Sequence, residues 1–294
     1  MPISDLLSIW KKKFEKTYVF SHWLLTLTKS VCYNDGEKRR AVKRLTPERK
    51  FTMEQKKIRV TIWNEFRHEK KDPEARSHYP KGIHGRIAEI LSECDDVEIR
   101  LASLDEPDHG INDEVLDNTD VLIWWGHGAH DEVRDDRVEY IRWRVCNGMG
   151  FIASHSAHHS KPFKRLVGTS GNLSWGDNCH EIMWNLNPYH PIAAGIPAYF
   201  DLGIEELYAE PFSIPQPEEI IFGAWYESGH VFRAGCTFSR GLGQIFYFQS
   251  GHESCDSYYN PYVAQIFKNA VHWAAPARCS YIAPEGAPYI KPIV

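Results

Sequence analysis

Residues 150–160, GFIASHSAHHS, place three histidines and three serines at the end of an apolar stretch. Histidine titrates near neutral pH and binds metals through its ring nitrogens, and a serine beside it can act as a nucleophile. His155 and His159 are four residues apart, a spacing that lets two side chains on one helix share a metal. His158 fits a solvated helix face better. The stretch therefore indicates acid–base, metal or nucleophilic chemistry at the end of a strand.

Three other apolar segments also end in titratable side chains, at Asn64-Glu65, Gly126-His127-Gly128 and Gly251-His252-Glu253. The carboxyl ends of parallel strands meet at one edge of an open sheet, where such sheets bind ligands. His84 joins this group because it begins a predicted helix whose N-terminus points to the same edge. Five other histidines are assigned to the surface or to structural roles: His68, His78, His109, His230 and His272. His190 is expected to organise a loop between two prolines near the same edge.

These side chains need a scaffold of alternating strands and helices, and the sequence from Ile58 onward has that pattern. Apolar runs predict strands at 58–63, 97–102, 120–126 and 150–155, and amphipathic stretches predict helices at 82–93 and 132–148. Strands separated by helices pair in parallel, so the pattern predicts a doubly wound α/β sheet. After Gly168 we expect a part rich in strands and hairpins, and a final helix over 260–275 that packs on the sheet.

The first 52 residues differ in character from the rest of the chain. They contain basic clusters such as KKKFEK (11–16), and an internal methionine, Met53, follows them shortly before the first predicted strand. We interpret 1–52 as an N-terminal extension that was appended or mis-started, and the alternative is a helical arm. The predicted domain covers 53–280, and 281–294 form a C-terminal tail.

Composition excludes several classes of function. The net charge of -5 offers no basic surface for nucleic acid or anionic membranes. The 7 cysteines are scattered and form no CxxC pair, which argues against a disulfide framework and favours the cytoplasm. No apolar run is long enough to span a bilayer. We therefore expect a cytoplasmic protein that acts on a small molecule; whether it forms a homo-oligomer stays open.

Nine short blocks, in order from about Ile58 to Pro276, resemble the ThuA-like family of trehalose utilisation proteins: WNEFRHEK, YPKGIH, WWGHGAH, GFIASHSAHHS, NPYHPIAAGIP, EELYAEPF, VFRAGCTFSRG, IFYFQSGHE and NAVHWAAP. The resemblance implies a flavodoxin-like fold similar to the class I glutamine amidotransferases, whose nucleophile lies on a sharp turn after a strand. Here that turn is Ser154-His155-Ser156 and holds no cysteine, so thiolate chemistry on glutamine is not expected. The resemblance also implies a role in disaccharide catabolism.

The residues and the resemblance together favour an enzyme that acts on trehalose or a related keto-glycoside by acid–base chemistry, with or without zinc or another divalent metal. In this interpretation Glu65 and Glu253 transfer protons, whereas His127, His155 and His252 polarise the sugar or bind the metal. The residues expected to contact the sugar are Asn64, His84, Glu205, Glu206, Tyr208 and Arg233, with Trp124, Trp125 or Trp225 as stacking surfaces.

Two alternatives stay open at this stage. One is a sugar-binding or regulatory module without catalysis. The other is a serine hydrolase on the amidotransferase-like fold that uses Ser156 with His252 and Glu253.

Overall fold

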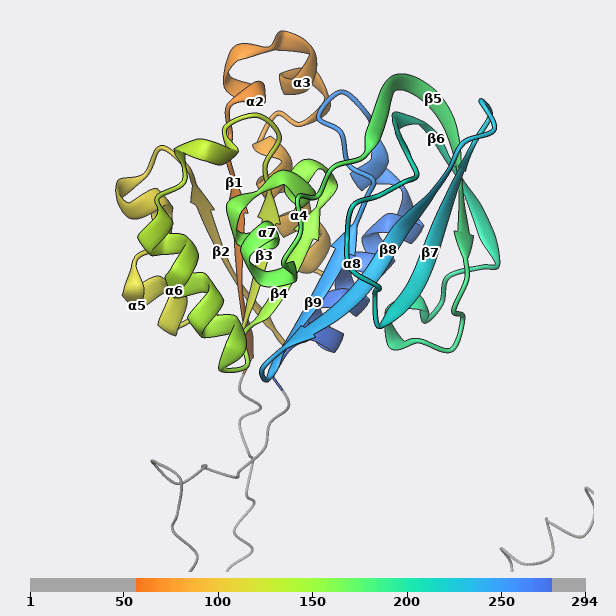
Figure 1. Ribbon diagram of the computed structural model, residues 1–294. Helices are drawn as coiled ribbons and strands as arrows, with labels where there is room; N and C mark the ends of the chain where they lie inside the picture. The colour runs from red at the N-terminus through yellow and green to blue at the C-terminus, as the bar shows by residue number, and fades with distance from the viewer. Residues whose placement is uncertain (1–56, 277–294) are drawn as a thin grey trace, which may run out of the picture. The chain divides into compact units, whose positions relative to one another are not determined.

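Residues 57–276 are described by a computed structural model and contain one nine-stranded sheet with the order β2-β1-β3-β4-β9-β8-β7-β5-β6 (Figure 1). The predicted segments 1–52 and 281–294 lie outside the described residues. Five neighbouring strands pair in parallel: β2 (Val97–Ser103), β1 (Ile58–Asn64), β3 (Val121–Trp125), β4 (Gly150–Ser154) and β9 (Gly243–Phe248). This order is that of a flavodoxin-like sheet, with β9 as its last parallel strand. The predicted fold class is therefore confirmed.

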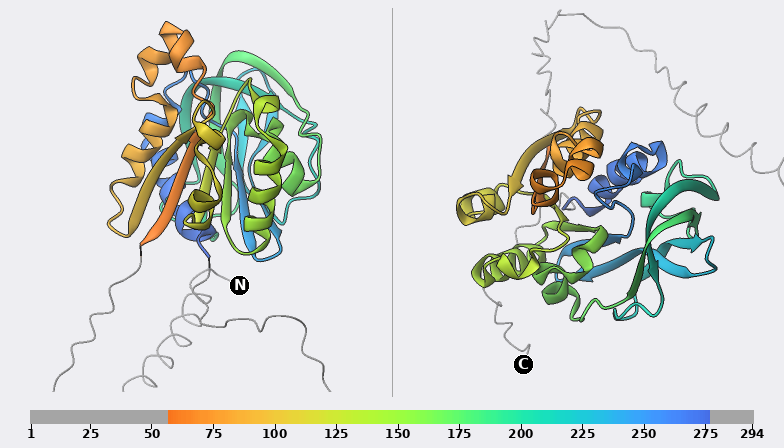
Figure 2. Two further views of the ribbon diagram at one scale, coloured as in Figure 1. Left: turned by 90° about the vertical axis from the view of Figure 1, so that its left-hand side faces the viewer. Right: turned by 90° about the horizontal axis from the view of Figure 1, so that it is seen from above.

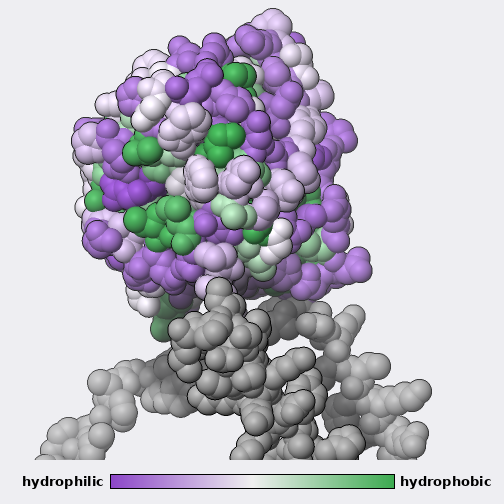
Figure 3. Space-filling view, turned by 90° about the vertical axis from the view of Figure 1, so that its right-hand side faces the viewer, coloured by the Kyte–Doolittle hydropathy of each residue, from purple (hydrophilic) through white to green (hydrophobic). Residues whose placement is uncertain are grey.

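The rest of the sheet is antiparallel and comes from the hairpin-rich C-terminal part. It consists of β8 (Val231–Arg240), β7 (Glu219–Tyr226), β5 (Ser174–Asn185) and β6 (Tyr199–Ala209). Figure 3 looks onto the end of the molecule where these strands lie and shows separate hydrophobic patches among polar residues. One groove of about 830 Å³ in this half is lined by Trp184, Tyr199 and Trp225.

Helices cover both faces of the parallel half, as the view from above shows (Figure 2). One layer contains α4 (Gly82–Leu91) and α8 (Pro261–Ala274), and the other contains α5 (Asp113–Asp117), α6 (Asp135–Cys146) and α7 (Lys161–Val167). Two short helices, α2 (His68–Lys71) and α3 (Pro73–His78), follow β1. Capping residues fix the ends of two of these helices. The Asn260 side chain accepts a hydrogen bond from the Tyr262 N–H in the first turn of α8, and Gly168, in the left-handed conformation, ends α7. Within residues 57–276, no helix combines the length and hydrophobicity that crossing a membrane requires.

The tryptophans at the carboxyl ends of β1 and β3 belong to the core. Trp63 and Trp124 stack with ring centroids 3.7 Å apart, and both side chains are buried. Trp125 is also buried, and its Nε1 donates to the Gly251 carbonyl at 3.0 Å. The prediction that Trp124 or Trp125 offers a stacking surface to a sugar is therefore wrong, because no face of either ring is exposed.

Replacing Gly243 at the start of β9 by alanine should destabilise the domain. An added Cβ would lie 2.2 Å from the Val145 carbonyl oxygen and 2.7 Å from that of Met149, so backbone must shift. Overpacking of this kind costs about 2–3 kcal/mol, or roughly 4–12 °C in Tm at this size. Thermal melts followed by circular dichroism measure it, with Gly176→Ala as the control because a Cβ there meets nothing within 4 Å. Equal melting temperatures for the two variants would contradict the argument.

Candidate functional site

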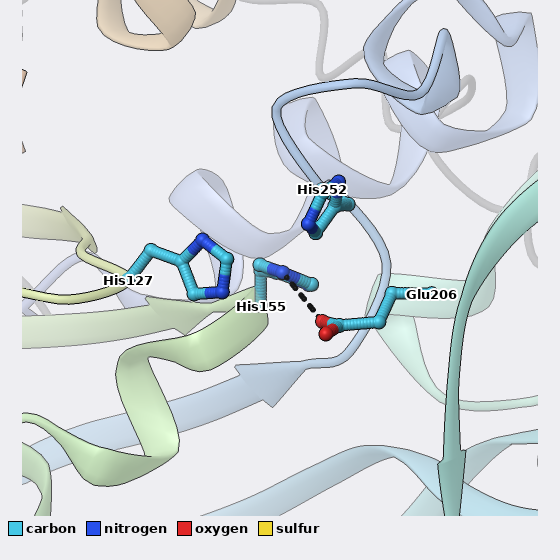
Figure 4. Close-up of side chains that lie close together, drawn as sticks. All are labelled: His127, His155, Glu206 and His252. Atoms are coloured by element: carbon cyan, nitrogen blue, oxygen red, sulfur yellow. Dashed lines mark ion pairs between the residues drawn. The ribbon is translucent and has the colours of Figure 1, made fainter. Parts of the chain in front are cut away.

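Three histidines and one glutamate converge at the carboxyl edge of the sheet (Figure 4). His127 follows β3, His155 follows β4, His252 follows β9, and Glu206 projects from β6 of the antiparallel half. One potential ligand atom from each side chain lies within 4.8 Å of the others. We call these four residues the His3Glu cluster. The strand-end rule thus brings the three predicted histidines together, and β6 adds a carboxylate to them.

His155 occupies the sharp turn after β4. Its φ of 55° is a conformation that L-residues rarely adopt, and it ends β4 one residue earlier than predicted. The side chain is fully buried, and its ring is nearly parallel to those of Trp125 and Tyr208. Nδ1 donates to the Gln249 carbonyl at 3.1 Å, so the neutral ring keeps its free lone pair on Nε2.

Nε2 of the His155 ring faces Glu206. Nε2 of His155 lies 3.1 Å from Oε2 of Glu206, and neither atom has another hydrogen-bond partner in the described part of the chain. Burial is the largest influence on the pKa of His155 and lowers it, but Glu206 and the other carboxylates nearby raise that pKa overall. Burial raises the pKa of Glu206, yet His155 and the neighbouring histidines lower it overall. Without a bound cation, these shifts favour a carboxylate paired with an imidazolium.

His127 is held by a second carboxylate. Its Nδ1 lies 2.9 Å from Oε1 of Glu253, which orients the ring and leaves Nε2 available. Burial raises the pKa of Glu253, but the hydrogen bond from His127 and the charges around it lower that pKa to about 2. Glu253 is therefore an anion near neutral pH. A carboxylate that binds the far nitrogen of a metal-ligating imidazole is a common arrangement in metal sites.

His252 differs from the other two histidines. The backbone N–H of Ser254 donates to its Nδ1 at 3.2 Å, and the Ser254 hydroxyl lies 2.8 Å from the same nitrogen. The backbone bond favours the tautomer with the proton on Nε2, which lies 3.6 Å from Oε2 of Glu253. Burial and the neighbouring His155 lower the pKa of His252. In this tautomer His252 adds an N–H donor to the cluster and has no free ring nitrogen to bind a metal.

Two buried carboxylates hold the loops that carry these histidines. Glu65 accepts from the backbone N–H groups of His127, Gly128 and Ala129 at 2.8, 3.0 and 3.0 Å. Burial raises its pKa, but hydrogen bonds to His68 and to this backbone lower it to about 2. Its predicted role in proton transfer does not fit the structure, because its lone pairs are occupied and its charge is strongly stabilised.

Glu205 holds the loop after β9, which carries His252. It accepts from the N–H groups of Gly251 and His252 at 2.9 and 3.1 Å and from the hydroxyl of Ser257. Adjacent residues of a strand point to opposite faces, so Glu205 and Glu206 cannot both face the cluster. The prediction that Glu205 contacts a sugar is accordingly replaced by a loop-holding role.

Several other predicted sugar contacts lie in separate networks. Asn64 donates to Glu69 at 2.7 Å and lies 3.0 Å from Nδ1 of His84, and all three side chains are buried. Arg233 forms a two-point ion pair with Glu210 and lines the groove of Trp184 and Trp225. Arg233 and Trp225 therefore line a groove that contains no member of the His3Glu cluster.

The segment after His155 also departs from expectation. His155–His159 form a 3₁₀ helix, whose three residues per turn do not place His155 and His159 on one face. The predicted metal pair is thus not formed, and His159 instead faces His130. His158 is buried, with Nδ1 donating to the Gly171 carbonyl at 2.7 Å, so its assignment to a solvated face is wrong.

Two residues near the site, Trp175 and Asp177, were not expected from the sequence, and a third, His68, was assigned to the surface or to a structural role. His68 lies 3.6 Å from Glu253 and forms with it and His127 a second group of close ligand atoms. Trp175 and Asp177 line a cavity of about 420 Å³ whose other walls include His127, His252 and Glu206. The strand-end rule could not find Trp175 and Asp177, because they come from an antiparallel strand. The available signal in the sequence was a tryptophan among polar residues and glycine, in NLSWGDN (172–178).

Comparisons with known proteins agree with this architecture. The family model described as trehalose utilisation, ThuA, matches residues 59–274. No curated protein matches the chain. A ThuA-like protein from Parabacteroides merdae is 16% identical with a TM-score of 0.58, covering 78% of this chain and 94% of that one. Its counterpart from Bacteroides uniformis is 16% identical with a TM-score of 0.55, covering 75% and 92%. At such identities the structures show a shared fold alone.

Proposed function

Because the chain belongs to the ThuA family, described as trehalose utilisation, we propose that it is a cytoplasmic enzyme of disaccharide or keto-glycoside catabolism that uses metal-assisted acid–base chemistry. The observation that carries this proposal is the His3Glu cluster, in which one ligand atom each of His127, His155, Glu206 and His252 lies within 4.8 Å of the others. Imidazoles and a carboxylate are the ligands of catalytic zinc sites. The proposed substrate is trehalose or a related disaccharide, including its keto derivative.

The hydrogen bonds around the cluster support a metal. His127 and His155 each have Nδ1 engaged by an acceptor, which leaves Nε2 free to bind an ion. Nε2 of His155 and Oε2 of Glu206 are buried, and within residues 57–276 each has only the other as a polar partner. Buried polar atoms usually have their hydrogen-bonding capacity filled, so a cation bound between these two atoms would supply the missing partner. When bound, a divalent ion would polarise a sugar oxygen and lower the pKa of water. His252, with its proton on Nε2, would then donate a hydrogen bond to a sugar oxygen in the cavity instead of binding the ion.

The serine hydrolase alternative is less well supported. The Ser156 hydroxyl pairs with the Tyr208 hydroxyl at 2.8 Å, and Nδ1 of His252 is occupied by Ser254. A relay requires the nucleophile to reach the base and the base to reach the carboxylate. The residue in the left-handed turn conformation is His155 and not a serine, so this turn presents an imidazole to the site.

We expect the full chain, purified without a histidine tag, to contain about one divalent metal per molecule, measured by inductively coupled plasma mass spectrometry. Glu206→Gln keeps the size of the side chain and removes the charge, and it should weaken metal binding at least about tenfold. The matched control is Glu227→Gln, an exposed glutamate outside the cluster. A chelator should lower the Tm of the wild type, because loss of a ligand that binds the native state destabilises it. Metal-free wild-type protein that takes up no added zinc, manganese or other divalent ion would refute the metal.

A further inference from the structure

The cavity beside the His3Glu cluster has one wall that the proposed chemistry does not use. Trp175 and Asp177 lie two residues apart near the start of β5, where a register shift typical of a β-bulge, between Gly176 and Cys179, interrupts the pairing with β6. Both line the cavity of about 420 Å³ that also contains His127, Glu206 and His252. Trp175 pairs in register with Tyr208 of β6, whose hydroxyl meets Ser156 deeper in the site. The wall is therefore built onto the element that supplies Glu206.

Trp175 is unusually exposed for a tryptophan. Its exposed fraction of 65% exceeds that of Trp143, Trp184 and Trp225, at 50, 45 and 40%. Trp143 stacks on Tyr140 and Trp184 packs on Tyr199, whereas Trp175 has no aromatic ring contact within residues 57–276. An uncovered indole in a cavity of titratable groups is a surface on which an apolar ligand face can pack.

The charges of the cavity restrict what that ligand can be. Asp177 and Glu206 are the acidic residues among its lining, and the described lining residues include no lysine or arginine. A phosphate group on the ring beside Asp177 would therefore meet a like charge, with no lysine or arginine in the described lining next to it. Hydroxyl groups, in contrast, can donate to both carboxylates. The lining suits a neutral polyhydroxyl compound with one apolar face.

We propose that Trp175 is the platform on which one ring of an unphosphorylated sugar stacks, and that Asp177 accepts hydrogen bonds from the hydroxyl groups of that ring. This inference rests on the proposed function and adds the specificity of its site. Trp175 is a binding residue that positions the sugar against the His3Glu cluster. Asp177 makes the site prefer the unphosphorylated sugar over its phosphate ester.

Calorimetric titration of the metal-loaded full chain with trehalose and with trehalose 6-phosphate tests the proposal. Trehalose should bind the wild type at least about tenfold more tightly than its phosphate. Trp175→Ala should weaken trehalose binding about tenfold or more, and Trp175→Phe should restore it to within about threefold. Trp143→Ala is the matched control, since Trp143 is exposed but lies on α6 and lines neither cavity.

Metal content is measured on every variant, because it separates this inference from the proposed function. Equal binding of trehalose by the wild type and Trp175→Ala would overturn the platform, as would a wild type that binds neither sugar. Equal binding of the phosphorylated sugar would overturn the discrimination. Trehalose binding that depends on Trp175 in a protein without metal would support the platform and contradict the metal chemistry.

Discussion

Replacing His155 by asparagine is expected to reduce turnover about 100-fold or more while the fold persists. Asparagine tolerates the φ of 55° at this position better than most residues, and its amide can still donate to the Gln249 carbonyl. What it removes is Nε2, the atom that lies 3.1 Å from Glu206 in the His3Glu cluster. The variant thus removes the reactive ring nitrogen while it keeps the backbone conformation of the turn.

The assay follows trehalose or its keto derivative in an extract that lacks the endogenous protein and is supplemented with each variant. Thermal melts of the same samples show whether His155→Asn is folded; we expect a loss of only a few degrees, at ~2–4 °C per kcal/mol. His272→Asn serves as the control, because His272 is an exposed residue of α8 that pairs with Asp96.

A cysteine nucleophile is the competing explanation, and the same assay addresses it. Burial raises the pKa of Cys236 to about 12, and burial together with Glu205 raises the pKa of Cys255 in the loop after β9. Neither thiol is activated, so Cys236→Ser should retain activity. Activity that survives in His155→Asn but disappears with a thiol-blocking reagent would show that the histidine is not the reactive centre.

The parallel half of the site was predictable from sequence for a topological reason. His127, His155 and His252 each follow an apolar run, and parallel strands must end at the same edge. Knowing that edge was enough to expect the three imidazoles together. The antiparallel half offers no such rule, because its strands end alternately at both edges. That is why Glu206 was expected only as a sugar contact, and Trp175 was not expected at all.

The roles of individual carboxylates were harder to predict than their positions. Glu65 and Glu253 both follow strands, and both have a pKa lowered to about 2 in the structure. Only the structure shows that Glu65 is occupied by backbone N–H groups whereas Glu253 orients His127. Backbone donors leave no trace in a sequence, since every residue except proline carries one. The burial of His158 could not be predicted for a related reason: its hydrogen-bond partner is a backbone group, the Gly171 carbonyl.

Glu65→Gln should cost the domain about 3 kcal/mol of stability at pH 7, or roughly 6–12 °C in Tm. The pKa of this buried carboxyl falls from an ordinary 4.5 to about 2, so folding favours its charged form. Glutamine keeps the length but loses the charge, and its amide N–H₂ group would face the N–H groups of residues 127–129. The loop that carries His127 should therefore loosen together with the fold.

The pH dependence gives this prediction a second, independent readout. A group whose pKa is lowered on folding stabilises the native state fully above the unfolded pKa and loses that effect as the pH falls towards the folded pKa. The difference between wild type and Glu65→Gln should thus be constant above about pH 5.5 and shrink as the pH falls from 4.5 towards 2. Urea unfolding in the presence of a chelator, at several pH values in this range, measures it without interference from a metal.

Glu139→Gln is the matched control for burial. The pKa of Glu139 is also lowered to about 2, first by its hydrogen bond to Arg165, but its side chain is 47% exposed. Exposed ion pairs contribute little because water and salt screen them, so this variant should unfold at nearly the same urea concentration as the wild type. If Glu65→Gln and Glu139→Gln behaved alike, or if the effect of Glu65→Gln did not change between pH 7 and pH 3, the backbone contacts of Glu65 would not hold the His127 loop in the way that their geometry indicates.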